Sequence, residues 1–88
     1  MKVVVLYRSQ TEYERAVLEF ERDYHMQTGR DLTLVDLNTK EGADLAELYD
    51  IVRYPAVLAR SNDGELLQLW QGELLPLIRD VAFYDQPE

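Results

Sequence analysis

Runs of apolar and polar residues along the chain predict alternating strands and helices. Residues 2–7 form a β-branched, apolar run, which predicts a strand buried on both faces. Apolar residues then recur at helical spacing over residues 13–24, and Gly29 favours a helix end because glycine adopts the left-handed conformation without strain. Ser9 and Thr11 each precede a glutamate by three positions. Either pair can form a capping box, so we expect this helix to begin near Thr11.

The second half of the chain continues this alternation. A turn rich in Asn, Asp and Gly separates two apolar runs and predicts an antiparallel hairpin. Pro76 is compatible with the first turn of a closing helix. The predicted elements are strands at 32–37, 56–60 and 65–70 and helices at 41–50 and 74–82. Their order, βαβαββα, implies a right-handed crossover between two parallel strands at the start of the chain.

The spacing within these elements assigns side chains to faces. Leu45, Leu48 and Tyr49 fall on one side of the second helix. On the fourth strand, Trp70 shares one face with Leu66, while Leu69 points to the other face. Both faces of such a sheet are covered by helices, so we interpret Trp70 as a packing residue rather than a ligand platform.

Length and charge narrow the class of protein. Eighty-eight residues, 47% of them hydrophobic, predict one globular domain over residues 1–88, with a frayed tail from residue 85. The 17 acidic residues outweigh nine basic ones, and a net charge of −8 argues against a nucleic-acid partner. The longest apolar runs are too short to span a membrane, and the N-terminus lacks a secretion signal, so we expect a cytoplasmic protein.

The chain contains no cysteine. This excludes disulfides, thiolate nucleophiles and zinc–thiolate sites formed by its own side chains. His25 is the only histidine, and we expect it to be a solvated surface residue because it lies off the apolar stripe of the first helix. The sequence therefore predicts no metal, no cofactor and no catalytic residue.

Several segments resemble thioredoxins and glutaredoxins. Residues 49–57, which read Tyr-Asp-Ile-Val-Arg-Tyr-Pro-Ala-Val, resemble the helix end, turn and cis-proline strand of thioredoxins. Residues 62–65 resemble the hairpin of that family, Gly72 matches a glycine after its last strand, and residues 3–7 resemble its first strand. The resemblance implies a thioredoxin-like fold, with a four-stranded mixed sheet in the order 2-1-3-4 flanked by three helices. It also implies a cis peptide bond before Pro55.

The chain departs from this family where its redox chemistry resides. Active members carry Cys-x-x-Cys at the start of the first helix, and alignment with that helix places Gln10 and Tyr13 at the two positions. Neither side chain forms a mixed disulfide, so thiol–disulfide exchange is impossible there. We therefore predict a cysteine-less, non-redox member that is not an enzyme.

The resemblance still implies a location for a binding site. In thioredoxins the residue before the cis-proline offers its backbone to an extended peptide, and here that residue is Tyr54, whose ring adds a packing surface. Our first hypothesis is a module that binds a protein or peptide through a face formed by Arg8, Ser9, Gln10, Thr11, Tyr13, Tyr54 and Pro55.

Two alternatives remain. Backbone N–H groups at the start of the first helix, with Arg8 adding charge, favour glutathione or a small anion, although capping by Ser9 or Thr11 would use the same groups. Alternatively, the contacts of an accessory protein would lie on the outer helix face.

Overall fold

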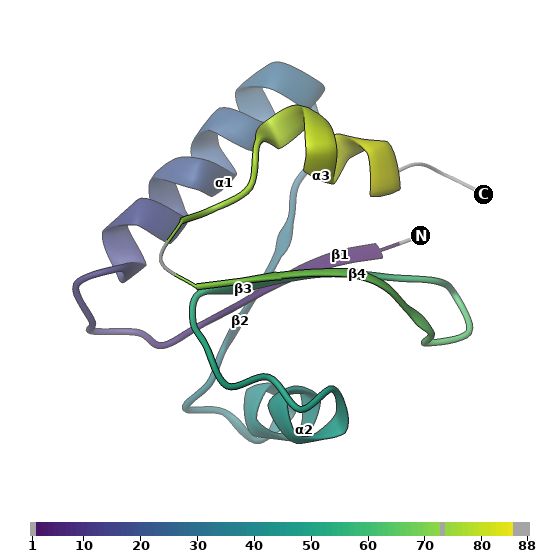
Figure 1. Cartoon of the computed structure of the whole chain (residues 1–88). Helices are drawn as coiled ribbons and strands as arrows, with labels where there is room; N and C mark the ends of the chain where they lie inside the picture. The colour runs from purple at the N-terminus through teal and green to yellow at the C-terminus, as the bar shows by residue number, and fades with distance from the viewer. Residues whose placement is uncertain (1, 73, 86–88) are drawn as a thin grey trace.

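The computed structural model describes residues 2–72 and 74–85 and contains a mixed sheet with helices on both faces (Figure 1). The four strands follow the order β2-β1-β3-β4, which confirms the predicted fold class. The elements are β1 (Lys2–Tyr7), α1 (Glu14–Thr28), β2 (Thr33–Asp36), α2 (Lys40–Leu48), β3 (Ala56–Arg60), β4 (Leu66–Gln71) and α3 (Ile78–Tyr84).

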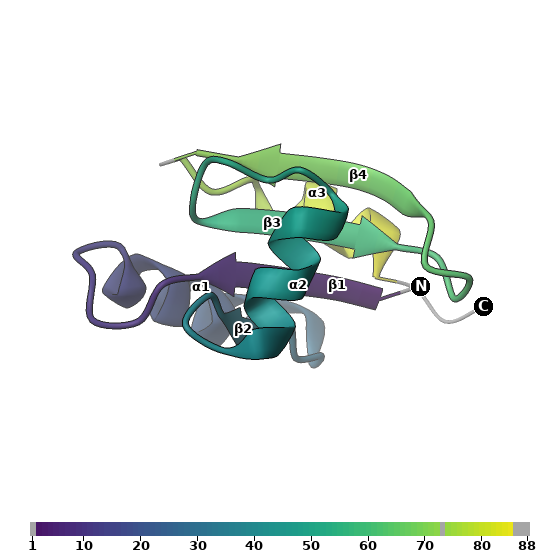
Figure 2. The ribbon, with the colours of Figure 1, turned by 90° about the horizontal axis from the view of Figure 1, so that it is seen from below.

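The sheet is built around β1 and β3. β1 pairs in parallel with β2, antiparallel β3 lies on its other side, and β4 completes the hairpin with β3. α1 and α3 cover one face of the sheet, and α2 crosses the other (Figures 1 and 2). Helices on both faces explain why the central strands read as continuous apolar runs in the sequence.

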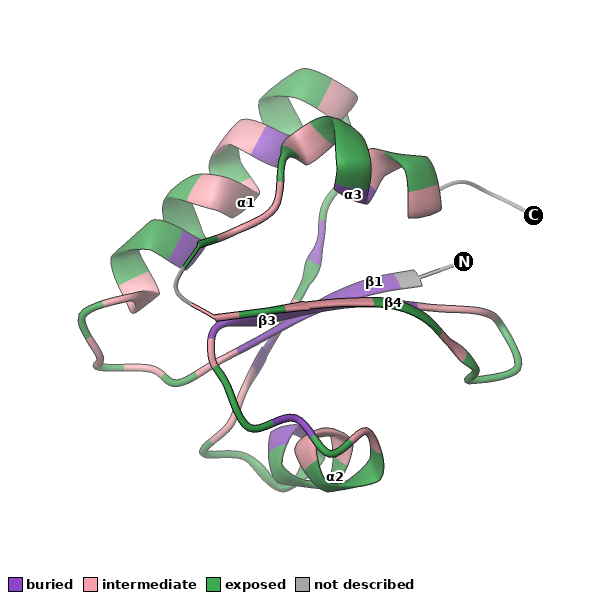
Figure 3. Ribbon diagram, in the orientation of Figure 1, coloured by how far each residue is buried: buried purple, intermediate pink, exposed green. Residues whose placement is uncertain are grey.

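Two apolar clusters fill the spaces between these layers. Val5 and Val57, neighbours in the β1–β3 register, are fully buried on the side of α1 and α3. Leu6 and Leu58 are fully buried on the side of α2. The buried stretches of β1 and β3 stand out against the partly exposed β4 (Figure 3). Alternation of side chains along each strand therefore divides the core between the two faces.

The start of α1 differs from the prediction. The helix begins at Glu14, Tyr13 is its N-cap residue, and no side chain caps it. Thr11 instead donates its hydroxyl proton to the carbonyl of Arg8 at 2.6 Å, and Gln10 has a φ of 61°. The residues expected to form capping boxes therefore build a turned loop, and the helix starts three positions later than expected.

The fourth strand also differs. Ala59 pairs with Gln68, but Arg60 pairs with Leu66, so Leu67 is an extra residue in a bulge. Because of this extra residue, the side chains that precede the bulge point to the opposite face of the sheet from the one that strict alternation predicts. Leu66 packs with the cluster on the α2 side rather than sharing a face with Trp70, which packs with the other cluster.

The two later helices are shorter than predicted. α3 begins at Ile78, and Leu74, placed in that helix by its spacing, lies before it with 91% of its surface exposed. Leu45 and Tyr49 pack against the cluster on the α2 side, whereas Leu48, placed on the same side of the helix by its spacing, ends α2 with 67% of its surface exposed. Gly42 is buried and packs so closely against β2 that a Cβ there would collide with the carbonyl oxygen of Asp36.

The chain end is held where fraying was expected. The fully buried Tyr24 donates its hydroxyl proton to Asp85 Oδ2 at 2.6 Å, which connects α1 to the residue that follows α3. The rest of the predicted frayed tail, residues 86–88, lies outside the described residues.

Candidate functional site

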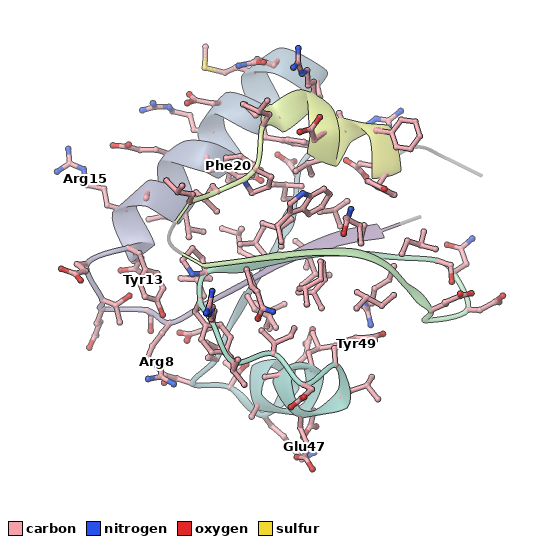
Figure 4. All side chains as sticks on the ribbon, viewed as in Figure 1. Arg8, Tyr13, Arg15, Phe20, Glu47 and Tyr49 are labelled. Carbon is pink, nitrogen blue, oxygen red and sulfur yellow. The ribbon has the colours of Figure 1, made fainter. Side chains whose placement is uncertain are left out.

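The predicted site residues follow β1 and precede β3, and they therefore lie at one end of the sheet. Leu6 pairs with Ala56 at the end of the β1–β3 ladder, so the loop that follows β1 and the segment that precedes β3 lie at the same end of the two strands, where the charge of Arg8 acts on Tyr54. The Tyr54–Pro55 peptide bond is cis. Figure 4 shows Arg8 and Tyr13 at this end of the molecule, where the loop after β1 turns into α1. The seven candidate residues thus belong to one region formed by two chain segments.

Tyr54 presents its backbone rather than its ring. No hydrogen bond among the described residues reaches its main-chain N–H or C=O. Its ring packs against the cluster on the α2 side, and its hydroxyl donates to the carbonyl of Ile51 at 2.7 Å. Burial raises the pKa of Tyr54, the charge of Arg8 lowers it, and Tyr13 raises it. The half-buried ring therefore helps to fix the loop, contrary to the expectation of a free packing surface.

Ser9 links the loop to β2. Its backbone N–H donates to Asp36 Oδ1 at 3.3 Å, and Asn38 Nδ2 donates to its hydroxyl at 3.3 Å. The pKa of Asp36 is lowered, first by the hydrogen bond from the Ser9 side chain and then by the N–H of Asn38. Ser9 is consequently engaged with the end of β2, away from the amides at the start of α1.

A carboxylate of the first turn of α1 bonds back to the loop that precedes the helix. Gln10 donates its N–H to Glu14 Oε1 at 3.2 Å, and Glu14 donates its N–H to the carbonyl of Thr11 at 3.2 Å. Burial raises the pKa of Tyr7, and the negative charges of Asp36 and Glu14 raise it further. A bound anion would therefore meet one carboxylate at the helix start and another at the end of β2.

Arg53 belongs to this region but was not singled out from the sequence. It is exposed, and its backbone N–H donates to Gln71 Oε1 at 3.3 Å. Neither Arg53 nor Arg8 forms an ion pair with another described residue. In the sequence, only the position of Arg53 directly before Tyr54 could have indicated that it belongs to the site. The two guanidinium groups give the site a positive character that the net charge of the chain conceals.

His25 has a partner that the sequence did not reveal. It is exposed, as expected, and its Nδ1 lies 2.8 Å from Asp31 Oδ1. Over residues 2–72 and 74–85, no three His, Cys, Asp or Glu side chains gather into a group able to hold a metal ion. None of the helices in the same part of the chain is long and apolar enough to cross a membrane.

The sheet order, the helices on both faces and the proline-containing loop define a thioredoxin-like fold. Among solved structures, the chain is similar to thioredoxin 1 from the thermophilic eubacterium Thermosipho africanus, with a TM-score of 0.65 and 13% sequence identity over 97% of this chain and 90% of that one. At this identity the similarity concerns the fold. No protein-family model matches the chain, and no curated protein matches it.

Proposed function

We propose that this protein is a non-catalytic interaction module that binds an extended protein or peptide segment at the face around Tyr54 and Pro55. The observation that carries the proposal is the main-chain N–H and C=O of Tyr54, which have no partner among the described residues. An extended segment pairs with such groups by strand-like hydrogen bonds. The chain itself contains no cysteine, so the same face does not perform dithiol exchange.

Neighbouring side chains define the rim of this site. Arg8 and Gln10 are exposed on one side of Tyr54, and Arg53 is exposed on the other. A segment carrying a carboxylate beside its paired residue would gain a charge-assisted hydrogen bond from either arginine. We infer a cytoplasmic protein or peptide as the partner, with no cofactor.

Glutathione or small-anion binding at the start of α1 is the weaker alternative. Glu14 already accepts the N–H of Gln10, and Ser9 is bonded to Asp36. An incoming anion would have to displace one carboxylate and tolerate another.

The test is affinity capture from native lysate, with partners identified by mass spectrometry, comparing the wild type with Arg8→Glu. Arg30→Glu is the matched control, because Arg30 is also exposed, lies after the far end of α1 and changes the net charge equally. Tyr54→Asp is unsuitable, since it would place a charge in the half-buried position of the ring.

Loss of a partner with Arg8→Glu but not with Arg30→Glu supports the proposal. Slower hydrogen exchange at the amide of Tyr54 in the captured complex would identify the backbone contact. Equal retention by both variants would contradict it. Shifts of the Gln10 and Glu14 amides with millimolar glutathione, without any protein partner, would favour the alternative.

A further inference from the structure

The edge of the sheet formed by β4 is an open hydrogen-bonding template. β4 is the outermost strand next to β3, and its sequence Leu-Leu-Gln-Leu-Trp-Gln contains neither a charged residue nor a proline (Figure 2). Natural edge strands usually carry such residues, which discourage pairing with another chain. Most of β4 is exposed or half-buried, in contrast to β3 (Figure 3).

The ladder identifies which groups of β4 face outward. Gly72 donates its N–H to the carbonyl of Pro55 at 3.2 Å, next to the pairing of Ala56 with Gln71. Groups pointing toward the partner strand alternate along an antiparallel strand, so Trp70 and Gln68 also point toward β3. The N–H and C=O groups of Leu69 and Gln71 therefore point away from the sheet.

One of these outward groups already has a substitute partner. The N–H of Leu69 donates to the side-chain Oε1 of its neighbour Gln68 at 3.0 Å. The main-chain groups of Gln71 receive no side-chain hydrogen bond from the described residues. In an added strand, a backbone carbonyl would replace the side-chain oxygen of Gln68 as the acceptor for the N–H of Leu69. The exchange costs little free energy, because the exposed Gln68 amide then forms hydrogen bonds with water.

A hollow beside this edge provides room for a side chain of the added strand. It has a volume of about 440 Å³ and is lined by Gln68, Trp70, Arg79, Asp80, Phe83 and Tyr84. Trp70 lies between the two outward residues, where the facing side chain of an added strand approaches most closely. The Trp70 and Tyr84 rings meet edge to face at 5.7 Å, and Phe83 is 66% exposed. These rings favour an aromatic side chain opposite Trp70.

We propose that the β4 edge binds an extended, positively charged peptide segment that inserts an aromatic side chain between β4 and α3. Asp63 and Glu65 precede β4, and Asp80 lines the hollow, whereas Arg79 is the only basic residue among its lining. The net charge of −8 attracts a basic segment and opposes a second copy of the chain. This surface adjoins the one around Tyr54 at Gln71, whose Oε1 accepts the N–H of Arg53, but it uses the main-chain groups of a different strand, so the inference goes beyond the proposed function.

The test uses the full chain labelled with ¹⁵N and a synthetic peptide, Lys-Thr-Val-Phe-Val-Thr-Lys. We expect shifts at the amides of Leu69 and Gln71 and at the Trp70 indole. An analogue with glutamate at both ends should bind about tenfold more weakly. An analogue N-methylated at alternate residues should not bind, because it lacks the donors for the edge.

A pair of variants isolates the hollow. Phe83→Ala should weaken binding by about tenfold, whereas Met26→Ala, at another exposed apolar position, on α1, should leave binding unchanged. No shifts at millimolar peptide, or equal binding of the acidic analogue, would overturn the inference. Shifts confined to Arg8 and Tyr54 would overturn it as well, because they would show that the peptide binds at the face around Tyr54. Concentration-dependent shifts at Leu69 without peptide would assign the edge to a second copy.

Discussion

The bond between Tyr24 and Asp85 offers a measurable test of how the chain end is held. The Tyr24 ring is fully buried, and its hydroxyl lies 2.6 Å from Asp85 Oδ2; neither side chain forms another hydrogen bond with the described residues. In Tyr24→Phe the partly buried carboxylate returns to water, so we expect a loss of about 1 kcal/mol in the free energy of unfolding. In Asp85→Ala the buried hydroxyl loses its acceptor, and we expect a loss of about 2 kcal/mol.

Urea and thermal unfolding would measure both losses. In a domain of this size, a loss of about 1 kcal/mol lowers Tm by about 4–8 °C. The double variant Tyr24→Phe/Asp85→Ala should be no less stable than Asp85→Ala, because without the hydroxyl the missing acceptor no longer matters. Additive losses in the double variant, or a Tyr24→Phe protein as stable as the wild type, would refute this reasoning.

The same bond makes stability depend on alkaline pH. Burial raises the pKa of Tyr24 above its ordinary value of 10.0, and the hydrogen bond and charge of Asp85 raise it further. The unfolded tyrosine therefore ionises first as pH rises. Its contribution to stability is complete below about pH 10 and is lost above it. The urea midpoint of Tyr24→Phe should fall less between about pH 9 and pH 11 than that of the wild type. An equal fall of the urea midpoint in both proteins would contradict the assignment of this pH dependence to Tyr24.

Three further predictions follow from individual contacts. Gly42→Ala should destabilise the fold by about 2 kcal/mol in urea unfolding, since the new methyl group meets the backbone of Asp36; an unchanged midpoint would show that α2 moves freely. Ser9→Ala should raise the pKa of Asp36, as followed by carboxyl ¹³C shifts, because it removes the side-chain hydrogen bond that contributes most to lowering this pKa; an unchanged pKa of Asp36 would contradict that cause. Burial raises the pKa of Glu21, so its contribution to stability is complete below about pH 4.5 and declines as pH rises through the higher folded value. Glu21→Gln keeps an acceptor for the N–H of Leu32, and its urea midpoint should change less between about pH 4 and pH 7 than that of the wild type. The same change of midpoint with pH in both proteins would exclude Glu21 as the cause of the pH dependence.

The strands at the centre of the sheet were predictable because burial on both faces leaves a continuous apolar run. β1 and β3 have the predicted bounds for this reason. The start of α1 was not predictable, since Ser9 is bonded to Asp36, 27 positions away, rather than to the helix. The bulge at Leu67 was equally hidden, because it depends on the register against β3.

The candidate site was only partly predictable. The resemblance to thioredoxins predicted a site formed by the loop after β1 and the segment before β3, and the order of the strands explains why these two segments lie at the same end of the sheet. It could not indicate that the Tyr54 hydroxyl bonds to Ile51, or that Glu14 occupies the start of α1. Those contacts depend on side-chain packing specific to this sequence, and they are the reason that an extended backbone stays preferred over an anion as the proposed ligand.

The central position of β1 also has a consequence for synthesis of the chain. β1 leaves the ribosome before both of its partners, β2 on one side and β3 on the other. Its β3 edge stays without a partner until Arg60 has emerged from the exit tunnel. During that interval the apolar run of β1 is exposed to other nascent chains. Chaperone binding to stalled nascent chains should therefore be strongest for those that end before β3 and should decline once the hairpin of β3 and β4 is complete.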